Sequence, residues 1–450
     1  MDLNSLPAEM ISAILEHLQP NDLTKLARVS KKYCEFAQAA LWRSIELHRQ
    51  DAHHDCVRLS VSDTIRRTYL DDHLRDPWSY CDFNENDQDF DRRHAKFATV
   101  VRKVYRTAGK SQAWARLGPM VQHLCLTVTN KSPPQIWDMI LSLQNLSTIE
   151  VIGENSLVHQ LPPQPTSLRE PAAKSICSVR LRGYIPALFV AAVCKASASS
   201  ISSLDIGVLE QPKVFVGDAD EEELGQELGY PLYVAPRGVL WFSDERTPRL
   251  SSLSHLMLCK RGSFDGPPDM SEEEDLEKRE DEEHELAELK HWASLLKSGR
   301  STLVEIVLDQ RPVYLSYLLN HGFELSSHDR TSFCPGLHSF DSAFYHHVLK
   351  TTFDDGGAWP ELKKLTFRGI NLLELEDEAG ESMDAWANRA LPGVKVQSTD
   401  SNYMFFNTRS GTIMNNGSAD GLMPHLDPEP DSGRDSFDME DHLLSILRSL

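Results

Sequence analysis

The sequence predicts an α/β protein, in which a small N-terminal module of three helices precedes an irregular solenoid of alternating short parallel strands and helices. Three observations lead to this fold class. The first fifty residues carry apolar side chains at helical spacing. From residue 120 onward, a short apolar pattern typical of a buried strand recurs seven times. Segments of helical character lie between several of these copies, which favours strand and helix units that stack side by side.

Composition limits the classes of function. The chain has 450 residues and a formal charge of −21, so it is long enough for two or three domains. This charge disfavours binding of nucleic acid or of an anionic membrane through overall charge. The eight cysteines lie at least 17 positions apart and form no zinc ribbon, redox motif or compact disulfide framework. The longest apolar run, residues 184–194, is too short to cross a bilayer. We therefore expect a reduced intracellular protein of the cytoplasm, the nucleus or both.

The first fifty residues predict three short helices. Pro7 suits a first helical turn, and the apolar positions of the first helix follow it. These positions are Ile11, Ile14, Leu15 and Leu18. Asn21 is a candidate N-cap of a second helix, and a third leads into residues 41–43. Because so short a segment buries only a modest core, we expect an apolar partner surface to stabilise it.

The order and spacing of these residues resemble an F-box over residues 5–46. The resemblance departs from the family at Tyr33, where tryptophan is usual, and at Ser30, where cysteine is frequent. The matching pattern is Leu6-Pro7-x-Glu9-Met10, Ile14-Leu15-x-x-Leu18, Pro20-x-Asp22-Leu23, Leu26-x-x-Val29-Ser30 and Leu41-Trp42-Arg43.

The resemblance implies that the module, residues 1–48, binds the Skp-type adaptor of a cullin-RING ubiquitin ligase and, through it, the cullin. The same apolar residues would also serve as the module's own core, and the sequence does not divide them between the two roles. Carried over by position, the adaptor-binding candidates are Leu6, Pro7, Met10, Ile14, Leu15, Leu18, Pro20, Leu23, Leu26 and Val29.

Residues 49–115 predict a helical and irregular linker between the module and the body of the chain. This segment contains His53-His54-Asp55-Cys56, four side chains of types that bind metals. Adjacent residues point in different directions on any regular backbone, and no second cluster supplies further ligands. We therefore interpret these residues as a solvated loop and predict no metal site.

The body, residues 116–400, is predicted from the pattern apolar, two residues, apolar, one residue, apolar. The central apolar residues of successive copies are 25, 30, 25, 52, 50 and 59 positions apart. The body resembles the leucine-rich repeats that often follow an F-box, as in fungal-like proteins of this type, although the repeat asparagine is missing and the period drifts. An ordinary α/β domain with parallel strands would satisfy the same pattern. The copies begin at Val121, Leu146, Ile176, Ile201, Leu253, Leu303 and Leu362.

The longer gaps predict insertions at residues 211–247 and 262–290. Eleven acids and three bases within residues 271–290 are typical of a solvated helix or a disordered loop, with binding of a basic partner as the alternative. Residues 401–437 predict a disordered linker. Residues 438–450 predict a short helix that would cap the fold or contact a partner, with a fraying tail as the default interpretation.

In a repeat of this kind, residues flanking the central apolar strand positions point to the concave face, where a client protein would bind. Each of them would equally fit plain solvated surface. The same rule includes Thr127, Glu150 and Met257. The substrate-binding candidates are Arg180, Arg182, Asp205, Asp309 and Arg368.

The chain has no nucleotide-binding, hydrolase or zinc-protease motif, and His346-His347 falls in an apolar helix pattern that favours a structural role. We predict no catalytic residues and no cofactor. The predicted function is the substrate-recognition subunit of a Skp-cullin-F-box ubiquitin ligase, which docks through the F-box and presents an unknown protein client bound on the repeats. One alternative is an F-box scaffold that acts with the Skp adaptor outside a ligase. Another is an enzyme, which would need a deep pocket lined by converging titratable groups.

Overall fold

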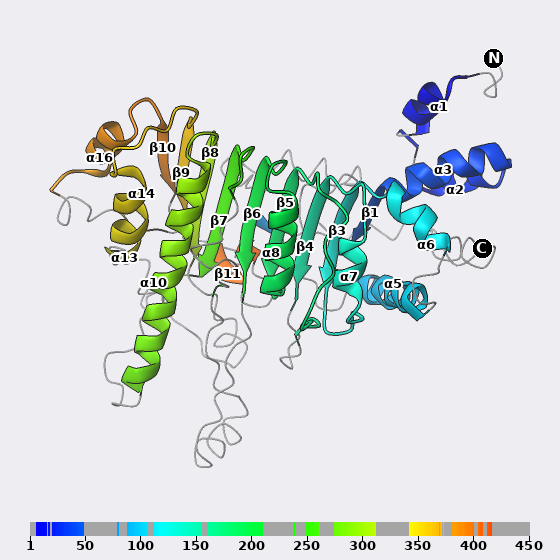
Figure 1. Cartoon of the computed structure of the whole chain (residues 1–450), viewed down its shortest axis with the longest axis horizontal. Coiled ribbons are helices and arrows are strands. Elements are labelled where there is room, and N and C mark those ends of the chain that lie inside the picture. Colours follow the sequence, from blue (N-terminus) through cyan, green and yellow to red (C-terminus); the bar gives the residue numbers. More distant parts are fainter. Residues whose placement is uncertain are drawn as a thin grey trace, which may run out of the picture.

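A nine-stranded parallel sheet forms the centre of the molecule, with the N-terminal helices at one end (Figure 1). The loop 53–56, the C-terminal helix predicted over 438–450 and most of the insertion 211–247 lie outside the described residues. The structure, a computed structural model, describes residues 6–15, 17–18, 20–48, 79–80, 88–106, 112–154, 161–209, 238, 249–261, 274–311, 342–368, 370, 372, 380–399, 404–407 and 412–415.

The three predicted N-terminal helices are confirmed. They are α1 (Ala8–Leu15), α2 (Pro20–Ala27) and α3 (Lys31–Arg43). Pro20 is the first residue of α2, where its missing N–H costs no helical hydrogen bond. Ser30 caps α3, because its hydroxyl accepts a 3.3 Å hydrogen bond from the backbone N–H of Tyr33.

The sheet contains all seven predicted strand patterns, and each strand pairs in parallel with the next along the chain. Two further strands, β1 and β10, form its two edges. The prediction of α/β structure with parallel strands is therefore confirmed. The strands are β1 (Ser44–Leu47), β3 (His123–Val128), β4 (Thr148–Gly153), β5 (Ser178–Gly183), β6 (Ser203–Val208), β7 (His255–Arg261), β8 (Glu305–Arg311), β9 (Lys364–Arg368) and β10 (Lys395–Thr399).

One face of the sheet is covered by helices, and the main core lies between them and the strands (Figure 1). Alternate strand residues such as Leu181, Ile206 and Leu308 belong to this core, as strand geometry requires. The helices over the middle of the sheet are α7 (Ile136–Leu141), α8 (Ala187–Ala196) and α10 (Glu274–Gly299). Toward the far end they are followed by α13 (Ser342–Phe344), the π-helix η5 (Tyr345–Lys350), α14 (Thr351–Phe353) and α16 (Met383–Ala390).

The structure gives the bounds of the helices in the acidic insertion and in the linker. From Glu274 onward the acidic insertion is the first half of α10, which extends past the edge of the sheet (Figure 1). The linker predicted over 49–115 contains the 19-residue helix α5 (Gln88–Arg106) and α6 (Gln112–Leu117), with a 3₁₀ turn (Gly118–Met120) leading into β3.

A small sheet lies on the opposite face of the large sheet, called the second face below. Its strands are β11 (Met404–Asn407), β12 (Thr412–Asn415) and β2 (Ser79–Tyr80). The order is β11-β12-β2, and β11 contacts β8 behind the sheet (Figure 1). Two of these strands lie within residues 401–437, where the sequence predicts a disordered linker. Apolar residues in both strands favour pairing, whereas the surrounding Gly, Asn and Asp dominate the average composition.

The N-terminal module joins the large sheet without a linker. Helix α3 ends at Arg43 and β1 begins at Ser44, so the strand lies inside the region predicted as a separate module. Trp42 is buried in the main core, and Leu41 packs against both that core and the core of the module. Two hydrogen bonds join Arg43 to Gln122: its Nε donates to Oε1 over 3.0 Å, and its carbonyl accepts from the Gln122 N–H over 2.9 Å. The module is thus continuous with the edge of the sheet.

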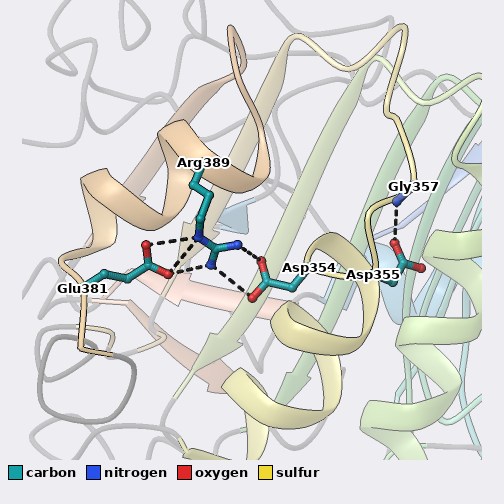
Figure 2. Close-up of polar contacts among 5 residues, drawn as sticks. All are labelled: Asp354, Asp355, Gly357, Glu381 and Arg389. Carbon is teal, nitrogen blue, oxygen red and sulfur yellow. Dashed lines mark hydrogen bonds and ion pairs between the residues drawn. The ribbon is translucent and has the colours of Figure 1, made fainter.

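At the far end of the sheet, ion pairs fasten α16 to the residues after α14 (Figure 2). Arg389 of α16 pairs with Glu381 at 2.5 Å and with Asp354 at 3.2 Å. The hydrogen bond from Arg389 is the main cause that lowers the pKa of Glu381. Burial alone would raise the pKa of Asp355, but hydrogen bonds from Arg300 and from the Gly357 N–H outweigh it, so the pKa is lowered.

We expect the contribution of Arg389 to stability to disappear in acid. A carboxyl with a lowered pKa in the folded state stabilises it above its unfolded pKa, and this stability is lost as the pH falls through the folded pKa. The Arg389→Met variant should therefore unfold about 1–2 °C below the parent at pH 7, and this difference should vanish between about pH 4 and pH 2. Thermal unfolding followed by circular dichroism measures it.

Arg116→Met is the matched control. Arg116 donates to the neutral amide oxygen of Gln38 over 3.3 Å, and an amide does not titrate. The Arg116→Met variant should change the unfolding temperature by the same amount at pH 7 and in acid. A constant difference for Arg389→Met as well would contradict the assignment to Glu381.

Candidate functional site

Large apolar side chains are exposed on the N-terminal module. Met10 is 52% exposed, Ile14 is 42% exposed and Val29 is 68% exposed. Met10 and Ile14 are four residues apart on α1, so they lie on the same face one turn apart. We call these three residues the apolar stripe.

The structure divides the ten adaptor-binding candidates by burial. Leu15 and Leu23 are buried and, with Ile11, form the small core of the module. Leu6, Leu18 and Leu26 are half-buried against that core, whereas Pro7 is exposed like the apolar stripe. The side chain of Pro20 is outside the described part of the structure. Helical periodicity alone could not make this division, because it does not say whether Met10 or Ile11 faces inward.

The apolar stripe has the chemistry of a docking surface. Isolated exposed apolar residues are common, whereas this module of about 40 residues exposes three large ones, two of them on one face of α1. Acids and bases balance over residues 1–50, six against six, so the segment is neutral while the rest of the chain carries the excess of −21. An apolar surface on a neutral module favours a partner that buries it rather than one that binds through charge.

The substrate-binding candidates alternate with core residues along their strands and so lie on the second face, but they are not exposed there. Arg182 and Asp309 are completely buried, Asp205 is 2% exposed and Arg180 is 9% exposed. Arg368 is only half-buried, with 15% of its side chain exposed. The expectation of solvent-facing contacts is therefore wrong for the first four residues. Alternation along the strands shows which residues oppose the core, but it does not show whether those residues are exposed.

These buried charges neutralise one another across neighbouring strands. Glu150, Arg180 and Asp205 are adjacent in the register of β4, β5 and β6. Arg180 pairs with Glu150 at 3.3 Å and with Asp205 at 3.1 Å. Arg182 also forms an ion pair with Asp205. Burial raises the pKa of Asp205, and the two arginines oppose this, so the carboxylate depends on both of them to stay ionised.

The arrangement continues toward the far end of the sheet. Asp309 and Arg368 are register partners on β8 and β9, and their charged groups are 3.9 Å apart. Arg182 lies over Gly207, where an added Cβ would approach the Arg182 Nη1 to 2.5 Å. Sequence reasoning missed this glycine, although a glycine inside a strand is a known sign of close approach by another group. We call Glu150, Arg180, Arg182, Asp205, Asp309 and Arg368 the charge ladder.

A small cavity under α10 bears on the enzyme hypothesis. It is lined by titratable groups including Cys259, Glu288 and His291, but its volume of about 10 Å³ holds at most one water molecule. Burial raises the pKa of the Cys259 thiol to about 12, so it is protonated at neutral pH and a weak nucleophile. This cavity is therefore not the deep pocket that a substrate would need. Within the part of the chain that is described, His, Cys, Asp and Glu side chains form no group able to hold a metal ion.

None of the helices in the described ranges has the length and apolar character to span a membrane.

Comparison with known proteins concerns the N-terminal module. No curated protein matches the chain. Residues 3–48 match the family model described as F-box-like. The matched span includes α1, α2, α3 and β1, and thus the apolar stripe. The chain therefore carries an F-box-like domain at residues 3–48.

Proposed function

We propose that the chain is the substrate-recognition subunit of a Skp-cullin-F-box ubiquitin ligase. The F-box-like domain docks on the Skp-type adaptor, and the body binds a protein client and holds it near the ubiquitin-carrying enzyme. The observation that carries this proposal is the apolar stripe on the domain matched as F-box-like. Met10, Ile14, Val29 and Pro7 are the adaptor contacts, while Leu15 and Leu23 hold the domain together.

The junction between α3 and β1 supports a receptor role. A client is ubiquitinated efficiently when its position relative to the enzyme is restricted, because a fixed geometry raises the effective concentration of the two partners. Trp42 is 8% exposed in the core of the body, and Leu41 contacts both cores. Docking the F-box-like domain therefore also orients the sheet.

The body is proposed to be a leucine-rich-repeat-like solenoid. Strands that follow the chain order, pair in parallel and have helices on one face support this interpretation. The second face is then the client-binding face.

Co-purification tests the proposed function. We expect the full chain to form a complex with a Skp-type adaptor and, through it, with a cullin in size-exclusion chromatography. A complex with the adaptor that excludes the cullin would favour a scaffold outside any ligase. Absence of binding by the folded chain would contradict the proposal.

A further inference from the structure

The second face of the sheet is buried although α7, α8 and α10 lie on the other face. Met257, Val307 and Thr366 are register neighbours on β7, β8 and β9, and they are 2%, 5% and 4% exposed. Asp309, two residues beyond Val307 on the same face of β8, is completely buried. A cover must therefore lie over β8 on this side.

The small sheet is the part of the described chain that lies against β8 on this side. We call its strands β11, β12 and β2 the strap. Residues 404–415 supply two strands and residues 79–80 the third, so the strap joins segments more than 300 positions apart in the sequence. Strand β11, which contacts β8, pairs with β12, and β12 pairs with β2.

The strap is held by few backbone pairs. Strands β11 and β12 share four residue pairs, and β12 and β2 share two. By contrast, β7 and β8 share seven pairs inside the large sheet. Small sheets of such short strands are marginally stable in water unless an apolar face anchors them. Local opening therefore requires less free energy than opening of the large sheet.

The surface beneath also favours reversible cover. Asp309 and Arg368 form an ion pair on β8 and β9, at the strand that β11 contacts, whereas apolar residues of similar volume often stabilise a permanently buried site as well or better. Paired charges become hydrated when a cover leaves, whereas an exposed apolar face promotes aggregation. Paired charges therefore suit a surface that alternates between covered and open states.

We infer that the strap is a removable cover that occludes the second face at β8 when closed and exposes that part of the face, with the Asp309–Arg368 ion pair, when open. The occupant of the open face is a segment of a protein client with both acidic and basic side chains, because Asp309 and Arg368 present both signs on the neighbouring strands β8 and β9. The identity of this occupant rests on the proposed function, whereas the opening of the strap does not.

Thiol labelling of two neighbouring positions tests the cover. Val307→Cys places a thiol on the second face of β8, and Leu308→Cys places one in the helix-side core of the same strand. Each is combined with Ile413→Pro/Met414→Pro, since these two residues of β12 pair with both β11 and β2, and proline removes the N–H donors. Mass spectrometry reads the labelling at each site separately from the native cysteines.

We expect the proline pair to accelerate labelling at position 307 at least tenfold and to leave position 308 unchanged. A chain that ends at Thr399 should behave in the same way and guards against an effect of proline alone. Unchanged labelling at 307 in both chains would overturn the proposal, because the strap would not cover β8. Equal acceleration at 307 and 308 would also overturn it, because the strap would then be an inseparable part of the sheet.

Adaptor binding by the same variants separates this inference from the proposed function. The apolar stripe is on the N-terminal module, so the proline pair should bind the Skp-type adaptor with the affinity of the parent. Selective labelling at 307 together with absent adaptor binding in every chain would leave the strap established as a cover and refute the ligase role.

Discussion

Met10→Asp combined with Ile14→Asp is expected to lower the affinity for a Skp-type adaptor at least 100-fold while the protein stays folded. Both side chains are about half exposed, so aspartate at these positions is solvated in the free protein. In the complex, two carboxylates would be buried against an apolar surface without partners, at a cost of several kcal/mol. Isothermal titration calorimetry with the purified adaptor measures the change.

Leu15→Asp is the informative counterpart. Leu15 is only 4% exposed in the core of the module, so aspartate there should unfold the three helices as well as abolish binding. Glu9→Gln changes another residue of α1 and leaves the apolar stripe intact, so this variant should bind the adaptor normally. If the Met10→Asp/Ile14→Asp protein bound with unchanged affinity, the apolar stripe would not be the docking surface.

Asp205→Asn is expected to reduce the free energy of unfolding by about 3–5 kcal/mol. Asp205 pairs with both Arg180 and Arg182, and removal of its charge leaves the completely buried Arg182 without this counter-charge. An uncompensated charge in the interior costs far more than the mean contribution of an ion pair. The midpoint of chemical denaturation measures the loss.

Two further variants show whether the cost comes from the unpaired charge. Asp22→Asn removes a surface pair with Lys25, in which both side chains are more than half exposed, so stability should change by less than about 0.5 kcal/mol. Arg182→Met/Asp205→Asn removes the buried guanidinium together with the carboxylate, while Arg180 keeps Glu150. This double variant should be more stable than Asp205→Asn alone. A smaller stability for the double variant would refute the charge-balance account.

Much of the large sheet could be predicted from the sequence, because burial of one strand face imposes a period of two. The seven patterns mark β3 to β9, and helices such as α8 lie between copies, where segments of helical character were predicted. The edge strands β1 and β10 escaped prediction. An edge strand pairs on one side only, and β1 has only Leu47 fully buried, so it carries too few apolar positions for the pattern.

The functional surfaces were less predictable, for physical reasons. Alternation placed Arg180 and Arg182 on the second face, but the cover over β8 comes from β11, more than 90 positions away along the chain. Similarly, helical spacing identifies the apolar residues of α1 without dividing them between the core and the partner. That division depends on where α3 packs, which local sequence does not encode.

The central claim, that the F-box-like domain connects a client held by the body to a ubiquitin ligase, is tested most directly by proximity labelling in cells. The intact chain and the Met10→Asp/Ile14→Asp variant are compared with and without proteasome inhibition. We expect a set of neighbours that becomes ubiquitinated and accumulates on inhibition with the intact chain, and that binds the variant without being ubiquitinated. The same neighbours, equally ubiquitinated and equally abundant with both chains, would contradict the account.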